Sequence, residues 1–92
     1  MLLLVPSDTN LFKQIHQARV TRELTVLYRT RVRGVDSKQR KGRLEEVNKG
    51  LYLNAAGLPA GSLVEVEGRT AGAGVLFSTG WVSADAVVRV EL

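Results

Sequence analysis

The sequence has no cysteine and a single histidine, His16. The lack of cysteine excludes disulfide bridges, thiolate metal sites and cysteine nucleophiles, and it fits a reducing compartment such as the cytoplasm. A lone histidine without Cys, His or acidic residues at ligand spacing indicates a packing or surface role. We therefore predict no catalytic residue, no metal and no cofactor, which favours a binding protein over an enzyme.

Long apolar runs are also missing. The N-terminal run, residues 1–5, is far shorter than the roughly 20 residues that span a bilayer, and no basic leader precedes it as in a signal peptide. We expect a cytoplasmic protein that has no contact with a membrane.

The chain is short, with 92 residues that we assign to one domain, 1–92. A domain of this size buries only about two thirds of the surface that its unfolded chain exposes. Pairing of two copies would enlarge the core, so we expect a homodimer.

The residue pattern predicts an α+β fold that is mainly β, with one N-terminal helix and a small barrel-like sheet. Ser7, Asp8 and Thr9 can cap a helix over residues 9–20, whose apolar residues recur at helical spacing. A short helical turn is predicted near residues 53–57. Residues 34–42 are predicted to form a flexible basic loop or hairpin tip, and turns are expected at 69–74 and 79–80. Strands are predicted at residues 2–5, 23–33, 43–47, 50–53, 63–68, 75–78 and 86–92.

Basic residues are concentrated in the first half of the chain. Residues 1–49 carry a net charge of +6, whereas residues 50–92 carry −2. Between positions 29 and 43 there is one acid, and an excess of one sign of charge on a folded surface favours a polyanionic partner. We expect DNA or RNA phosphates to bind the seven bases of this segment: Arg29, Arg31, Arg33, Lys38, Arg40, Lys41 and Arg43.

The first three of these bases occupy every second position of the predicted strand 23–33. A period of two places Arg29, Arg31 and Arg33 on one face of the strand. The opposite face is apolar and would pack on the core through Leu24, Val26, Tyr28 and Val32. The sequence therefore predicts an outward-facing arginine ladder, which the loop bases 38–43 would extend.

Two segments carry a family resemblance. Residues 24–29 read LTVLYR and residues 50–68 read GLYLNAAGLPAGSLVEVEG. In this order they resemble the SymE-like branch of the AbrB/MazE group of swapped-hairpin proteins, although Tyr52 stands where that pattern has tryptophan. The resemblance implies a dimer with interleaved hairpins, a basic face that binds DNA or RNA, and a role in a toxin–antitoxin system.

A second resemblance covers the C-terminal half. Residues 58–68 (LPAGSLVEVEG) and 80–87 (GWVSADAV) are similar to bacterial Src-homology-three-like barrels. This resemblance implies a protein–protein interaction module in which Trp81 contacts the partner. The alternative function is then a phage or mobile-element inhibitor whose basic surface docks on an acidic host protein.

Overall fold

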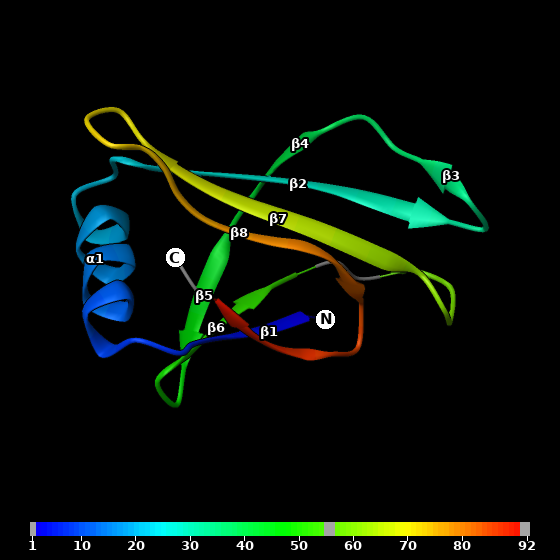
Figure 1. Ribbon diagram of the computed structural model, residues 1–92, viewed down its shortest axis with the longest axis horizontal. Coiled ribbons are helices and arrows are strands. Elements are labelled where there is room, and N and C mark those ends of the chain that lie inside the picture. Colours follow the sequence, from blue (N-terminus) through cyan, green and yellow to red (C-terminus); the bar gives the residue numbers. More distant parts are fainter. Residues whose placement is uncertain (1, 55–56, 91–92) are drawn as a thin grey trace.

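The computed structural model describes residues 2–54 and 57–90, which form one helix and two β-sheets (Figure 1). The fold is α+β and mainly β, as predicted. The elements in chain order are β1 (Leu2–Pro6), α1 (Thr9–Val20), β2 (Leu24–Val32), β3 (Val35–Asp36), β4 (Arg40–Gly42), β5 (Leu44–Val47), β6 (Gly50–Leu53), β7 (Leu63–Thr70), β8 (Gly74–Ser83) and β9 (Val87–Val90).

One sheet has four strands in the order β5-β6-β1-β9, in which β1 runs antiparallel to β6 and parallel to β9. The other has five strands and is antiparallel: β7 lies between β2 and β8, and both β3 and β4 pair with β2. Because β7 occupies one side of β2, the short strands β3 and β4 share its other side. The chain then passes from β4 in one sheet to β5 in the other through Arg43.

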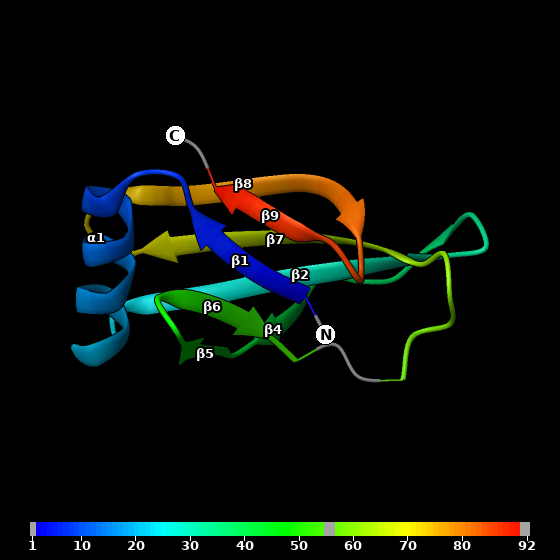
Figure 2. The ribbon, with the colours of Figure 1, turned by 90° about the horizontal axis from the view of Figure 1, so that it is seen from below.

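The hydrophobic core lies between the two sheets and the inner face of the helix. Leu4 of β1, Leu11 and Ile15 of α1, Val64 of β7 and Phe77 of β8 are at most 2% exposed. Figure 2 shows α1 standing across one end of the sheets, while β1 and β9 cross β2 and β7 obliquely. The helix therefore closes one end of the core.

Local signals in the sequence explain the helix. Asp8 has an extended backbone, and its carboxylate accepts a hydrogen bond from the backbone N–H of Asn10 at 2.8 Å. Such a cap satisfies a backbone donor that the first helical turn leaves free. The predicted helix 9–20 is confirmed at both ends.

The alternation predicted for β2 is confirmed, but the end of the strand is not. Val26 is buried and Leu24 and Tyr28 pack against the core, whereas Val32 at the end of the strand is not part of the described core. The strand ends at Val32, and Arg33 (φ 52°) and Gly34 (φ 78°) form the two-residue turn into β3. Two successive left-handed residues are the geometry of a tight hairpin turn. The prediction that Arg33 continues the ladder is wrong, because Arg33 lies in this turn.

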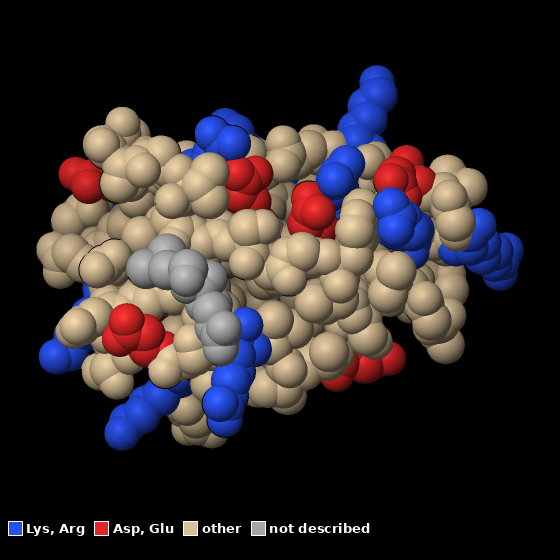
Figure 3. Space-filling model, in the orientation of Figure 1, with Lys and Arg blue, Asp and Glu red and all other residues tan. Residues whose placement is uncertain are grey.

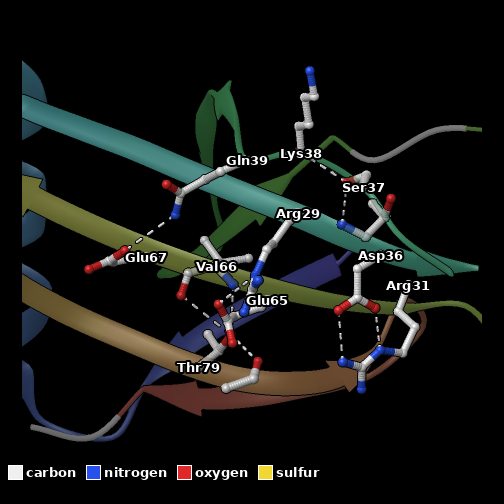
Figure 4. Close-up of polar contacts among 12 residues, drawn as sticks. Arg29, Arg31, Asp36, Ser37, Lys38, Gln39, Glu65, Val66, Glu67 and Thr79 are labelled. Atoms are coloured by element: carbon white, nitrogen blue, oxygen red, sulfur yellow. Dashed lines mark hydrogen bonds and ion pairs between the residues drawn. The ribbon is translucent and has the colours of Figure 1, made fainter. Parts of the chain in front are cut away.

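The predicted loop 34–42 is partly strand. Gly42 allows β4 to approach the core closely, because a Cβ atom at this position would lie 2.8 Å from both Tyr28 Cδ1 and Leu53 Cδ1. Ser37 also fastens the segment to β2, since its hydroxyl accepts a hydrogen bond from the Thr30 N–H at 2.9 Å (Figure 4). The segment is therefore held along most of its length.

The predicted turn at residues 79–80 is wrong, because β8 continues through it. The pairing of β7 with β8 shifts register at this point, and the Thr79 hydroxyl accepts a hydrogen bond from the Val66 N–H at 3.0 Å. Gly80 has a positive φ of 65°, which a glycine adopts without strain. This irregularity keeps the strand continuous, so Trp81 lies within β8 and not between two strands.

Two predictions fall partly on undescribed residues. The helical turn near residues 53–57 includes positions 55–56, and the last predicted strand includes positions 91–92. Over the described residues, none of the helical structure is long and apolar enough to cross a membrane.

Candidate nucleic-acid interface

Arg29 and Arg31 lie on the outer face of β2, as predicted, but each is paired with a carboxylate. In the strand register Arg29 lies opposite Glu65 of β7, and its Nε donates to Glu65 Oε1 at 3.1 Å. Arg31 lies opposite Asp36 of β3 and donates from Nε at 2.5 Å and from Nη2 at 3.0 Å (Figure 4). Both guanidinium charges are therefore matched within the sheet.

Trp81 lies beneath the same two arginines. The guanidinium carbons of Arg29 and Arg31 lie 4.9 and 4.1 Å from the indole centroid. A cation over an aromatic face is attracted by the negative potential of the ring. The two arginines therefore cover the tryptophan that was predicted to contact a protein partner.

The Arg31–Asp36 pair keeps both groups ionised. The hydrogen bonds from Arg31 lower the pKa of the Asp36 carboxyl, and the same contacts raise the pKa of the Arg31 guanidinium. At neutral pH the pair is therefore a fixed dipole with little net charge.

The charge balance extends along β7. Arg69 Nη2 lies 2.9 Å from Glu67 Oε1, and the Gln39 amide donates to Glu67 Oε2 at 3.4 Å. Figure 3 shows blue and red groups next to one another near β2 and β7. The outer face of this sheet therefore carries paired positive and negative side chains rather than charges of one sign.

In the part of the chain that the structure describes, the remaining predicted bases have no carboxylate partner. Within the described part of the chain, all five are exposed and none takes part in an ion pair. They lie in the β2–β3 turn, between β3 and β4, on β4 itself, and where the chain crosses to β5. We call this set the basic edge: Arg33, Lys38, Arg40, Lys41 and Arg43.

The basic edge presents positive charge on both faces of β4. Arg40 lies opposite Tyr28 in the register, and its guanidinium carbon lies 5.5 Å from the tyrosine centroid. The next residue, Lys41, lies opposite Leu27 on the outer face of the sheet. Among the described residues β4 pairs only with β2, so its other edge has no strand partner.

The sequence alone did not reveal the carboxylates that match the arginines. Glu65 alternates with the buried Val64 and Val66 along β7, but its position opposite Arg29 depends on the pairing of β2 with β7. Asp36 lay in the predicted loop. The register of β2 against β3 and against β7 would have been needed to identify the two pairs.

Among the described residues, no three His, Asp or Glu side chains lie close enough together to hold a metal ion. His16 lies on α1 with its Nδ1 2.7 Å from Glu46 Oε2 of β5. This contact joins the helix to the first sheet, which is a structural role.

No protein-family model, curated protein or solved structure matches the chain.

Proposed function

We propose that the protein binds nucleic acid along the basic edge. The observation that carries the proposal is the presence of five exposed, unpaired cations within residues 33–43 of the described chain. Lysine and arginine side chains without carboxylate partners are free to replace the counterions of a phosphate backbone. Among the described residues, three of the four ion pairs made by arginines lie on the outer face of the same five-stranded sheet, where they leave less charge for a ligand.

The ladder arginines take a secondary part in this proposal. A phosphate approaching Arg29 or Arg31 also meets Glu65 or Asp36, whose charge opposes it. We therefore assign the attraction of the polyanion to the basic edge and a supporting, structural role to the ladder.

Binding is tested with two matched triple variants. One carries Lys38→Ala, Arg40→Ala and Lys41→Ala, and the other carries Lys13→Ala, Lys49→Ala and Arg89→Ala. All six residues are exposed and make no ion pair within the described chain, so the two variants lose the same charge from comparable sites. Fluorescence anisotropy with a labelled duplex and a labelled RNA strand should show much weaker binding for the first variant only. Equal weakening of both would mean that only net charge matters.

The protein-binding alternative ranks second because Trp81 is covered. A partner that used the indole face would first have to displace two guanidinium groups lying 4.9 and 4.1 Å from it. Capture of an acidic protein that is lost on Trp81→Ala, with the basic residues intact, would favour this alternative.

The homodimer and the toxin–antitoxin role belong to the swapped-hairpin proposal. The dimer predicts twice the 10.0 kDa chain mass in light scattering. A mass of one chain would remove that proposal and leave binding by the basic edge intact.

A further inference from the structure

A groove of about 700 Å³ opens where the basic edge ends. Its walls are the last turn of α1, the start of β2 and the crossing from β4 to β5, and Arg43 belongs to both the groove and the basic edge. The volume falls within the range of about 300–1,000 Å³ that small-ligand sites occupy. A nucleic-acid strand bound along residues 33–43 therefore reaches this groove.

The lining of the groove combines apolar and cationic groups. Val20 of α1, which is 62% exposed, and the half-buried Leu24 of β2 supply apolar surface. Arg22 and Arg43 are exposed without an ion pair among the described residues. Arg19 is fixed in the wall, because it donates to the Leu44 carbonyl at 3.4 Å and lies 3.6 Å from Glu46. The two free arginines are thus available to an anionic group beside an apolar surface.

We infer that this groove holds one unpaired nucleotide of the strand bound along the basic edge, an inference that rests on the proposed function. The base packs against Val20 and Leu24, and its phosphate lies between Arg22 and Arg43. Glu45, an exposed carboxylate of the lining without an ion pair in the described chain, accepts from an exocyclic amino group of the base. A base inside a duplex is stacked and paired and cannot enter without being extruded. The groove therefore confers a preference for single-stranded nucleic acid.

The experiment uses Arg22→Gly with Lys49→Gly as its control. Arg22 (φ 61°) and Lys49 (φ 62°) are both exposed, have a left-handed backbone and make no ion pair with a described residue, so glycine removes one charge from each without strain. Lys49 lies in the β5–β6 turn, outside the groove. Affinity is measured for a single strand and for the duplex of the same sequence at one salt concentration.

Loss of a charged hydrogen bond in the groove should weaken single-strand binding by about tenfold in Arg22→Gly. Duplex binding should fall only as much as in Lys49→Gly, and the control should lower both affinities by the same small factor. Single-strand and duplex binding that fall equally in Arg22→Gly would overturn the inference while leaving the basic edge as the binding surface. Wild-type protein that binds neither nucleic acid would instead refute the proposed function itself.

Discussion

The functional difference among the basic residues is set by what each side chain contacts. Arg29 and Arg31 each have a carboxylate in the opposite register position and an indole beneath them, whereas Lys38 and Lys41 have no carboxylate within the described chain. Removing both charges of an exposed ion pair together costs the protein little stability. Sequence position alone does not separate the two groups, since all four lie within thirteen positions of one another.

This difference predicts the effect of a charge-neutral substitution. Arg29→Gln combined with Glu65→Gln should change nucleic-acid affinity by less than about twofold, because the net charge of the face is unchanged. Lys38→Gln combined with Lys41→Gln removes two unpaired cations and should weaken binding at least about tenfold. Anisotropy titrations at one salt concentration compare the two, and a larger loss in the Arg29 and Glu65 pair would contradict the assignment.

The Asp36 carboxyl predicts an acid-dependent loss of stability. Its folded pKa lies below the ordinary value of 3.8 because Arg31 donates hydrogen bonds to it. A lowered folded pKa stabilises the protein above the unfolded pKa, and this contribution disappears as the pH falls through the folded pKa. Urea unfolding from about pH 6 to pH 2 should therefore show a steeper loss for wild type than for Asp36→Asn. Parallel curves would show that the pair does not form in solution.

Gly68 predicts a steric cost in the core. A Cβ atom there would lie 2.1 Å from Phe77 Cε1, so Gly68→Ala should lower the free energy of unfolding by about 1–3 kcal/mol through overpacking. Gly72→Ala is the control, because nothing lies within 4 Å of its Cβ position and its φ is not positive. Equal stability of the two variants in urea unfolding would contradict the packing of Phe77 on β7.

At the scale of elements, the accuracy of the sequence predictions follows the range of the interactions. The helix 9–20 and the strand 50–53 were predicted with correct ends, because caps, turns and apolar spacing are local signals. The strands β3 and β4 were missed, since polar residues form them only by pairing with β2. The continuity of β8 was missed for a similar reason: the irregularity at residues 79–80 has the composition of a turn and is held by β7.

Gly42 of the short strand β4 is expected to set the position of the basic edge. Gly42→Ala would place a methyl group 2.8 Å from Tyr28 and Leu53, which should push β4 away from β2. Hydrogen exchange of the amides in β4 should become faster, and nucleic-acid affinity should fall although no charge is lost. Gly72→Ala again serves as the control. Unchanged exchange and affinity in Gly42→Ala would mean that β4 does not position the basic edge.

At the scale of the whole molecule, the fold separates paired from unpaired basic residues more clearly than their order in the sequence does. The net charge of +4 is small, yet nine of the 13 bases make no ion pair in the described chain and five of these lie within residues 33–43. The α+β architecture followed from residue periodicity, whereas the matched carboxylates depended on strand register. The site was therefore predicted as a segment, and the structure divides it into a paired face and an unpaired edge.

The central claim is that the basic edge neutralises phosphates, and the salt dependence of binding tests it most directly. Five phosphate contacts predict a slope of log affinity against log salt of about −4.5 for duplex DNA and about −3.5 for a single strand. The variant with Lys38→Ala, Arg40→Ala and Lys41→Ala should reduce the magnitude of these slopes by about 2 to 3. The triple variant at Lys13, Lys49 and Arg89 should retain the wild-type slopes. Equal slopes in the two triple variants, or wild-type affinity that does not respond to salt, would contradict the claim.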